Sequence, residues 1–354
     1  MLRIRDLILP ETHDVSELYY HAAQALHIRA SDIAALHIFR RSLDARKKPD
    51  LRWVYTVDVT LRSGEGAVLR RCRSAKITRE VPYVYRIPRC TAAERPVVVG
   101  FGPAGMFAAL VLAKAGLRPL VLERGDPAPL RREKVERFWS GGPLDPESNV
   151  QFGEGGAGTF SDGKLTTRIG DELCGFVTEV FLEHGAPKEI AWQQKPHVGT
   201  DLLRVVITSI RKEIESLGGE VHFNTALTGF ERRDGQLVGI QTTDGAFPCE
   251  ALVFAVGHSA RDTFGMLMDS GLVLECKPFS VGFRAEHLQS EIEKSLYHEA
   301  AGHPALPRGE YQLSQHVEKR CVYTFCMCPG GQVVASASEK GRVVTNGMSY
   351  HARS

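Results

Sequence analysis

The stretch VVVGFGPAGMFAALVLAKAGLRPLVLERG, residues 97–125, is the longest apolar run in the chain and decides its fold. A membrane-spanning helix needs about 20 predominantly apolar residues with few charges. This run instead carries five glycines, together with Lys114 and Arg118. The pattern of these interruptions favours a nucleotide-binding turn over a membrane span.

The order of residues in this stretch predicts a strand, a glycine turn, a helix and a second strand. Residues 97–99 are β-branched and typical of a buried strand, and residues 106–115 favour a helix that Gly116 ends. Residues 120–122 form the second strand, and Glu123 stands at its tip. This is the βαβ unit of dinucleotide-binding proteins, in which an acid follows the glycines by ~20 residues.

Each glycine of the G-x-G-x-x-G pattern has a physical reason. Gly100 permits a tight turn, Gly102 lets the backbone approach a pyrophosphate, and Gly105 lets the helix pack closely on the strand. The helix N-terminus then offers free N–H groups to the anion. Glu123 is placed to accept hydrogen bonds from the two ribose hydroxyls, which a 2′-phosphate would oppose. A glycine-rich turn without a ligand is the alternative.

The composition fits an enzyme with a large core. With 354 residues, 43% of them hydrophobic, the chain should divide into two or three domains. A net charge of +2 implies no strong general attraction to nucleic acid or to an anionic membrane. Charges interrupt the first residues where a signal peptide needs its apolar core, and eight cysteines without regular spacing suit a reducing compartment. We expect a cytoplasmic protein.

The first segment, to about residue 90, predicts a small α+β module. Residues 16–26 suit a helix, and residues 51–61 alternate as a half-buried strand that pairs with residues 35–45 in a long hairpin. Basic residues surround the hairpin turn, and they fit either a solvated turn, which we expect, or a contact with RNA. These residues are Arg40, Arg41, Arg46, Lys47 and Lys48.

A second glycine cluster follows a predicted polar helix at residues 129–142. It reads ESNVQFGEGGAGTFSDGKLTTR, residues 147–168. Glycine inside a strand or helix is destabilising by roughly 0.5–1 kcal/mol relative to alanine, so such density is of little use there. The cluster predicts a loop whose backbone touches a flat or charged ligand, with a mobile surface loop as the alternative.

The next segments predict the rest of a nucleotide-binding domain. Thr200 or Asp201 can cap a helix that Gly218 ends. Residues 220–245 read as strands around the turn Asp234-Gly235. Residues 249–262 begin with an apolar strand that returns to the parallel sheet.

With these motifs the chain resembles flavoproteins of the glutathione-reductase type of FAD fold. More closely, it is similar to a bacterial family of FAD-dependent dehydrogenases, also described as NAD(P)/FAD-dependent oxidoreductases. The resemblance runs from residue 97 almost to residue 354. It is carried by residues 100–105 with Glu123, and by SNVQFGEGGAGTFSDGKL, KPHVGTD, FAVGHSARD, KPFSVGFRAEH, YTFCMCPGG and VVTNGMS.

The resemblance implies FAD as the cofactor and an α/β fold of three parts. We expect a small N-terminal α+β module at 1–90, a Rossmann-like FAD/NAD(P)-binding domain at 91–275, and part of an inserted β-rich substrate domain at 276–354. Members of the family continue beyond the position of Ser354, so we expect a truncated chain with an open flavin end. Whether this chain alone retains FAD is therefore a question for experiment.

The predicted cofactor-binding residues come from the glycine turn, the second glycine cluster and the returning strand. They are Gly100, Gly102, Pro103, Ala104, Gly105, Glu123, Arg124, Gly155, Gly156, Gly158, Thr159, Ser161 and Gly257.

Four residues are candidates for catalysis. Lys164 would stabilise the negative charge of a reduced flavin, with a solvated lysine as the alternative. His197 and His258 are candidate proton-transfer groups because histidine titrates near neutral pH, or they are simply hydrogen-bonded in loops. Arg284, which follows a predicted apolar strand, suits a substrate carboxylate or pairs with Glu286.

Three cysteines near the end of the chain raise two further ideas. Cys321, Cys326 and Cys328 lack the second cysteine pair that a structural zinc site needs, so we expect no metal. If residues 321–331 form a strand, Cys326 and Cys328 share one face. They are then either a redox thiol pair near the flavin or small buried apolar residues.

The leading functional prediction is an FAD-dependent oxidoreductase that transfers hydride through bound flavin to or from a small molecule. We expect no separate NAD(P)H domain, so NAD(P)H would act at most as a transient reductant. A non-catalytic FAD- or ADP-binding module, including an inactive flavoprotein, is the first alternative, and a flavin monooxygenase is the second. The sequence does not indicate the oligomeric state.

Overall fold

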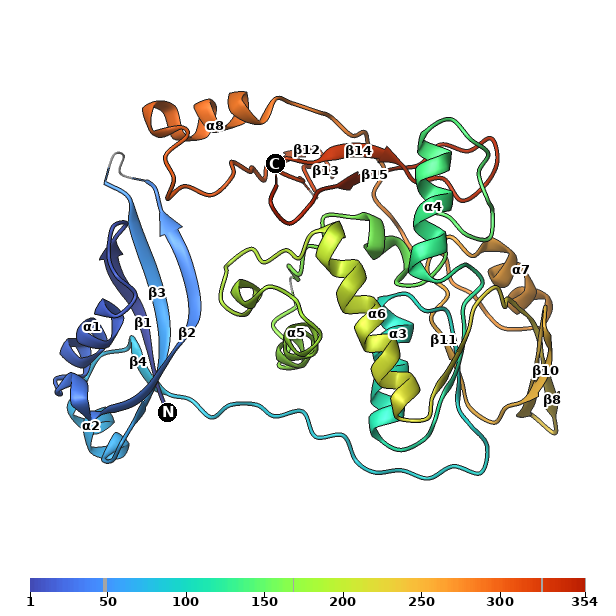
Figure 1. Ribbon diagram of the computed structural model, residues 1–354, viewed down its shortest axis with the longest axis horizontal. Helices are drawn as coiled ribbons and strands as arrows, with labels where there is room; N and C mark the ends of the chain where they lie inside the picture. The colour runs from blue at the N-terminus through green and yellow to red at the C-terminus, as the bar shows by residue number, and fades with distance from the viewer. Residues whose placement is uncertain (47–49, 168, 326, 354) are drawn as a thin grey trace.

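The computed structural model describes residues 1–46, 50–167, 169–325 and 327–353. Its N-terminal part is a four-stranded antiparallel sheet in the order β2-β3-β1-β4 (Figure 1). Helices α1 and α2 cover one face of this sheet and enclose a core of its own. The elements are β1 (Leu2–Pro10), α1 (Glu17–Leu26), a 3-10 turn (Ala30–Asp32), β2 (Ile33–Asp44), β3 (Arg52–Leu61), α2 (Glu65–Arg71) and β4 (Ile77–Arg79).

Strands β2 and β3 form the predicted long hairpin. They pair antiparallel down to Asp44 and Arg52, next to the turn. The predicted alternation is confirmed at Tyr55, Val57 and Val59, which are at most 1% exposed because this face of the sheet packs against the helices.

Two basic residues near this hairpin have partners within the chain. Arg46 pairs with Asp44. The guanidinium of Arg41 lies over two tryptophan rings, 4.3 Å from the centroids of Trp53 and of Trp192. Arg41 therefore takes part in the contact between the N-terminal sheet and the rest of the chain. The predicted turn residues Lys47 and Lys48 lie outside the described residues.

An extended connector, residues 80–96, joins the two parts without helix or strand (Figure 1). It is held to the nucleotide-binding part at Tyr85, at Cys90 and at Arg95, which forms an ion pair with Glu220 at 2.7 Å. The Tyr85 ring lies 4.7 Å from the Phe176 ring, and the backbone N–H of Cys90 donates to the carbonyl oxygen of Ala115 at 3.0 Å.

The second part is built on a parallel sheet in the order β11-β5-β6-β7. Its central strands, β5 (Val97–Val99) and β6 (Leu120–Leu122), are the two predicted strands, and they are parallel neighbours. Helix α3 (Pro103–Lys114) connects them, as predicted. The remaining elements are α4 (Ala128–Trp139), 3-10 turns (Gly156–Phe160 and Lys188–Ala191), α5 (Leu173–Glu183), α6 (Thr200–Ser216), β7 (Glu220–His222), β11 (Leu252–Phe254) and α7 (Arg261–Asp269).

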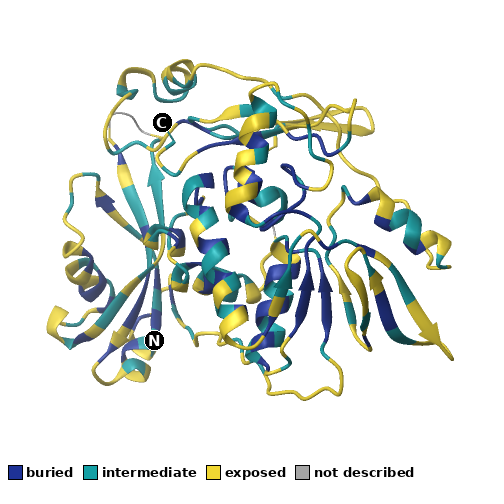
Figure 2. Ribbon diagram, turned by 45° about the vertical axis from the view of Figure 1, so that its right-hand side comes forward, coloured by how far each residue is buried: buried dark blue, intermediate teal, exposed yellow. Residues whose placement is uncertain are grey.

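Side chains of the central strands alternate between two apolar layers. Val98 and Val121 pack with residues of α3 and α6. Val99 and Leu122 pack on the opposite side with a three-stranded antiparallel sheet in the order β10-β9-β8. Figure 2 shows the central strands as buried ribbons. The strands of the antiparallel sheet are β8 (Leu227–Arg233), β9 (Gln236–Thr242) and β10 (Gly245–Pro248).

The predicted turn between β8 and β9 is confirmed. Asp234 and Gly235 have φ angles of 51° and 81°. Two successive positive φ angles are typical of the type I′ turn, whose twist matches that of paired strands. The predicted strand that returns to the parallel sheet is also confirmed, because β11 pairs parallel with β5.

The C-terminal part adds one helix and two hairpins, which lie above α6 in Figure 1. The indole N–H of Trp139 in α4 donates to the carbonyl oxygen of Ala335 at 2.8 Å and joins one hairpin to the nucleotide-binding part. The elements are α8 (Gln289–Tyr297), a 3-10 turn (His298–Ala300), β12 (Ser314–Val317), β13 (Arg320–Tyr323), β14 (Gln332–Ala335) and β15 (Thr345–Met348).

The strand predicted before Arg284 was wrong. Residues 272–288 form neither helix nor strand, and Phe279 and Phe283 are 87% and 104% exposed. An apolar run becomes a strand only where a neighbouring strand takes its hydrogen bonds, and within the described ranges none pairs with it. Of the described residues in 321–331, considered above as a possible strand, only those up to Tyr323 belong to one, because β13 ends there.

The predicted side-chain cap of α6 was also wrong. The N-cap is Gly199, with no capping side chain. The Thr200 hydroxyl donates to the carbonyl oxygen of Ser161 instead, and the Asp201 carboxylate accepts from the backbone N–H of His351 at 2.9 Å. These hydrogen bonds join the segments of Ser161 and His351 to the start of α6.

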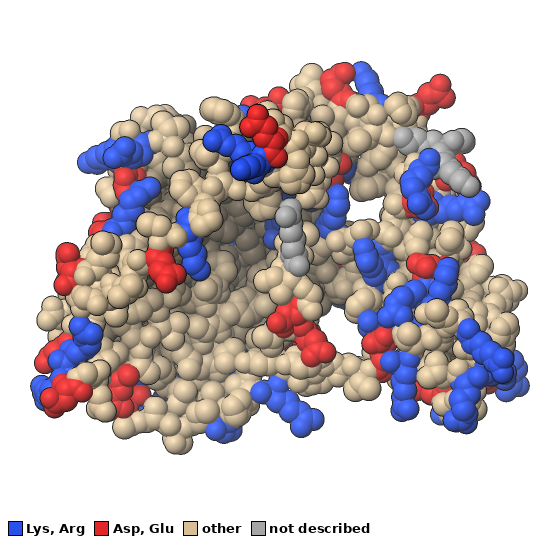
Figure 3. Space-filling model, turned by 180° about the vertical axis from the view of Figure 1, so that it is seen from behind, with Lys and Arg blue, Asp and Glu red and all other residues tan. Residues whose placement is uncertain are grey.

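The surface shows no dominant charge. Seen from behind, lysines and arginines gather mainly over the N-terminal sheet, whereas much of the rest of this face is uncharged and is hollowed near its centre (Figure 3). In the described part of the chain, every helix is too short or too polar to cross a membrane.

Candidate functional site

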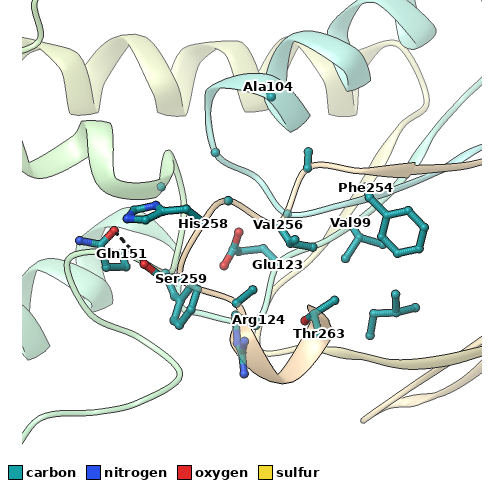
Figure 4. Close-up of a pocket in the computed structure, with 18 of the residues that line it drawn as sticks. Val99, Ala104, Glu123, Arg124, Gln151, Phe254, Val256, His258, Ser259 and Thr263 are labelled. Atoms are coloured by element: carbon teal, nitrogen blue, oxygen red, sulfur yellow. Dashed lines mark hydrogen bonds between the residues drawn. The ribbon is translucent and has the colours of Figure 1, made fainter. Parts of the chain in front are cut away.

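A cavity of about 510 Å³ opens at the carboxyl ends of β5, β6 and β11. Its wall consists of the glycine turn, the tip of β6, the 3-10 turn of the second glycine cluster, and the segment after β11. Figure 4 shows the Glu123 carboxylate among these residues. Open sheets of this kind bind nucleotides in the crevice at this edge.

The first and third glycines of the turn are required by the fold. Gly100 has a φ of +94°, and a Cβ there would lie 2.4 Å from the carbonyl oxygen of Ala255. A Cβ at Gly105 would lie 1.9 Å from the carbonyl oxygen of Gly100. The structure therefore agrees with the tight turn expected at Gly100 and with the close packing of helix on strand expected at Gly105.

The middle glycine is different, because the fold does not require it. Gly102 has an ordinary φ of −76°, and a Cβ there would meet its nearest atom, the Cα of Gly156, at 3.8 Å. Both glycines line the cavity, so bare backbone forms this part of the wall. Gly102 also provides no side-chain cap for α3. The N–H groups of Ala104 and Gly105 in its first turn are thus left for an anion.

Glu123 holds the parts of the cavity wall together. It is 4% exposed, and one carboxylate oxygen accepts from the N–H of Phe101 at 2.8 Å. The other accepts from the N–H groups of Gly125 and Gly153, both at 2.9 Å. A carboxylate has about four acceptor positions, so about one remains for a ligand. The sequence predicted that Glu123 accepts from two ribose hydroxyls, but the three backbone N–H groups leave an acceptor position for about one.

The buried side chain of Arg131 in α4 holds the second glycine cluster by hydrogen bonds to its backbone. It is 0% exposed, and its guanidinium donates to four backbone carbonyl oxygens. The acceptors, with their distances, are Asn149 (2.8 Å), Glu154 (2.6 Å), Val150 (3.0 Å) and Gly156 (2.8 Å). Burial lowers the pKa of Arg131 to about 10, although the charges of Glu123 and Glu154 act to raise it. The loop that carries Gly156 is therefore folded around one buried cation.

Glu154 joins this loop to two helices. Its carboxylate accepts from the backbone N–H of Ala128 at 2.7 Å and from Arg211 of α6 at 2.7 Å. Sequence analysis missed both Arg131 and Glu154. The signal for Arg131 was its position in α4 on the same face as the buried residues Ala128 and Val135.

Arg124, a predicted cofactor-binding residue, lines the cavity but is held by two carboxylates. It makes two hydrogen bonds to Asp262, at 2.9 and 2.7 Å, and one to Glu147 at 2.9 Å. Burial acts to lower the pKa of Arg124, but the hydrogen bonds to Asp262 and Glu147 outweigh it, so the pKa is raised. Its guanidinium also lies 4.5 Å from the centroid of the Phe152 ring.

The other predicted cofactor residues divide into two groups. Pro103, Ala104, Gly158 and Gly257 line the cavity together with Gly100, Gly102 and Gly156. Gly105, Gly155, Thr159 and Ser161 are absent from its described lining. Gly155 and Thr159 pack on each other beneath α6, where a Cβ at Gly155 would lie 2.5 Å from Ile207, and the Ser161 hydroxyl donates to the carbonyl oxygen of Gly158 at 2.8 Å.

Residues 153–158, GEGGAG, repeat the glycine spacing of the first turn. No strand precedes them in this described stretch, and they open only the 3-10 turn Gly156–Phe160. The repeat is therefore not a second dinucleotide-binding unit.

The four candidate catalytic residues do not come together. His258 lines the first cavity beside Ser259, whose hydroxyl lies 3.4 Å from the Gln151 side-chain oxygen (Figure 4). Lys164 and His197 are backbone neighbours in an antiparallel bridge, and Lys164 lines a different cavity. Arg284 lines a third cavity and donates to the Asn346 side chain at 3.3 Å.

His197 is buried against the C-terminal segment. Its Nε2 lies 3.0 Å from the carbonyl oxygen of His351, and the two imidazole rings stack 5.4 Å apart. Burial lowers the pKa of His197, and the nearby charge of Arg353 lowers it further. The folded protein therefore favours the neutral imidazole.

This pKa shift predicts a pH dependence of stability. Between the lowered folded pKa and the unfolded value near ~6.5, the unfolded chain binds more protons, so stability falls as the pH drops below about 6.5. His197→Gln should flatten this fall in the free energy of unfolding, measured by urea titration at a series of pH values. The exposed His316→Gln should keep the wild-type slope. An unchanged slope in His197→Gln would show that His197 does not contribute.

Two of the three cysteines lie in the described part of the chain. Cys321 is exposed and Cys328 is half-buried, and Cys326 lies outside the described residues. Among the residues that the structure does describe, no three His, Cys, Asp or Glu side chains are grouped to hold a metal ion. The idea of a redox pair at Cys326 and Cys328 stays a prediction.

Comparison with known proteins gives the class. Residues 278–354 match the family described as FAD-dependent protein, C-terminal domain-like, and residues 1–60 match a domain of unknown function (DUF8436). The first match relates the C-terminal part of the chain to FAD-dependent proteins.

An uncharacterized protein of Clostridium beijerinckii is 48% identical over 357 residues, covering 99% of this chain and 67% of that protein. The chain belongs to the family of this protein. FixC of Escherichia coli K12 is 25% identical over 204 residues, covering 56% of this chain and 44% of FixC. The structure of Thermovibrio ammonificans THI4 is similar at 18% identity, with a TM-score of 0.33 over 51% of this chain and 63% of that one. That last likeness is too slight to bear on the reaction.

Proposed function

We propose that the chain binds FAD in the cavity at β5 and β6 and works as an oxidoreductase on a small-molecule substrate. The observation that carries this proposal is the bare backbone wall at Gly102 and Gly156. Internal packing does not require glycine at position 102, where a Cβ would lie 3.8 Å from its nearest neighbour. A diphosphate bound against the start of α3 would explain why position 102 is a glycine.

The residues of the cavity fit the adenosine diphosphate half of FAD. The N–H groups of Ala104 and Gly105 would hold the diphosphate. The remaining acceptor position of Glu123 would take a ribose hydroxyl. A 2′-phosphate would bring negative charge against this buried carboxylate, so the cavity favours an unphosphorylated ribose.

Bound FAD supplies hydride transfer, and the chain's task is to bind and orient it and to manage protons. Of the four candidate catalytic residues, His258 is the one in the same cavity as Glu123. We propose it as the proton-transfer group of this site. NAD(P)H is proposed only as a transient reductant, because GEGGAG lacks the strand of a second dinucleotide-binding unit.

The alternative is an FAD- or ADP-binding module without turnover. The scatter of Lys164, His197 and Arg284 away from the first cavity favours it. Anaerobic mixing of the FAD-loaded chain with NADH, NADPH and a panel of small-molecule donors separates the two. Loss of the flavin's visible absorbance with any donor supports the oxidoreductase. If dithionite reduces the flavin and none of the donors does, the result would support the binding module. Rapid NADPH-linked oxygen consumption would indicate a monooxygenase.

A further inference from the structure

A second cavity, of about 610 Å³, lies where the end of the second glycine cluster meets the C-terminal part. The loop that contributes Gly156 and Gly158 to the first cavity continues to Lys164, which lines this one. The volume is in the range of small-molecule sites. One loop thus takes part in both cavities.

Cations outnumber acids in the described lining of this second cavity. Its described lining includes the cations Lys164, Lys195 and Arg353 and a single acid, Glu310. Lys195 and Glu310 form an ion pair and offset each other. The ammonium group of Lys164 has no ion-pair or hydrogen-bond partner among the described residues. Its charge is therefore available to a ligand.

Arg353 adds a buried donor that lacks an acceptor. Its side chain is 12% exposed, and its Nε has no hydrogen-bond partner in the described structure. Arg353 forms an ion pair with the buried Asp162, but the 3.7 Å between its Nη2 and the Asp162 oxygen is too long for a hydrogen bond. Asp162 already accepts from the Ser349 hydroxyl. A buried N–H without an acceptor is unfavourable, so an acceptor brought by a ligand would be favoured.

The segment that carries Arg353 is held in place before any ligand binds. The N–H of His351 donates to Asp201 at 2.9 Å, and the N–H of Arg353 donates to the carbonyl oxygen of Tyr350 at 3.1 Å. Gly330 packs so closely that a Cβ there would lie 2.0 Å from the Arg353 carbonyl oxygen. The backbone that carries Arg353 therefore needs little reordering when a ligand binds.

We propose that this second cavity binds a small-molecule carboxylate, held by Lys164 and Arg353. A guanidinium fork and an ammonium group form charge-assisted hydrogen bonds with carboxylate oxygens, and the Thr166 hydroxyl in the lining suits the polar remainder of such a molecule. This inference rests on the proposed function, because it names the substrate class of that oxidoreductase. It assigns Lys164 to the substrate and not to the reduced flavin.

The test is calorimetric titration of the full FAD-loaded chain with succinate and, as the uncharged match, succinamide. Succinate should bind and succinamide should not. Lys164→Met should weaken succinate binding at least tenfold, and Arg353→Lys should weaken it because the fork is lost. Lys277→Met, which removes an exposed lysine outside the described cavities, should bind as the wild type does.

Three results would overturn the inference: no succinate binding by the wild type, equal binding by Lys164→Met, or tighter binding of inorganic phosphate than of succinate. Because binding is measured without turnover, the result is separate from the anaerobic reduction test. Succinate binding that Lys164→Met abolishes supports the site even if no donor reduces the flavin. Flavin reduction without a carboxylate site would leave the proposed function standing and remove this inference.

Discussion

Replacement of Arg131 by methionine is expected to lower the free energy of unfolding by about 3–5 kcal/mol. The side chain is completely buried and donates to four backbone carbonyl oxygens of residues 149–156. Methionine fills a similar volume but leaves these acceptors without a donor, and it removes a cation whose charge favours the nearby Glu123 and Glu154. Urea unfolding of the two proteins measures the difference.

The matched control is the next residue. Arg132 is 53% exposed and makes only an ion pair with Glu136 within α4, so Arg132→Met should change the free energy of unfolding by no more than about 0.5 kcal/mol. Equal stabilities of the two variants would contradict the account of how the second glycine cluster is held. Because this cluster supplies Gly156 to the cavity, Arg131→Met should also lose FAD affinity.

The second large effect is expected at Glu123. The Glu123 carboxylate accepts from three backbone N–H groups through two oxygens. In Glu123→Gln one of these oxygens is replaced by an NH₂ group, which cannot accept, so at least one N–H donor loses its acceptor. A buried donor left without an acceptor costs about 1–3 kcal/mol. We expect a loss of this size in the free energy of unfolding and a fall of at least tenfold in FAD affinity.

Glu94→Gln is the control for this substitution. Glu94 is exposed in the connector, and its change should affect neither quantity. If Glu123→Gln binds FAD as the wild type does, the carboxylate does not contact the ribose. If its stability is also unchanged, the hydrogen bonds to Phe101, Gly125 and Gly153 are not the ones that shape the cavity.

Elements with strong local signals were predictable. The strands at 97–99 and 120–122 were placed correctly because β-branched residues and glycines with fixed backbone demands define them within a few residues. The hairpin of β2 and β3 followed from strict alternation, since one face had to be buried. The structural task of Gly105 was predictable because its closest neighbour, the Gly100 carbonyl oxygen, lies within the same βαβ unit, whereas the close neighbour of Gly100, the Ala255 carbonyl oxygen, lies far along the chain.

Features that depend on distant contacts were not predictable. Arg131 finds its acceptors in a loop that follows α4, and a polar helix gives no hint of them beyond one arginine on the buried face. Thr200 and Asp201 have the residue types of helix caps, but their side chains hydrogen-bond to the backbone of Ser161 and of His351 instead. Whether a run such as residues 278–283 becomes a strand depends on a neighbouring strand, which its own residues do not encode.

The measurement that tests the central claim most directly is an equilibrium titration of FAD against the wild type and Gly102→Ala. The alanine fits the φ of −76°, and its methyl group would meet its nearest atom at 3.8 Å, an ordinary van der Waals contact, so thermal unfolding of the apo forms should coincide. Gly175→Ala, in α5 with open space around it, is the control and should bind as the wild type does. We expect one FAD per wild-type chain and at least tenfold weaker binding by Gly102→Ala, because its methyl group projects where the diphosphate lies. Equal affinities would contradict the claim that the backbone at Gly102 holds the diphosphate.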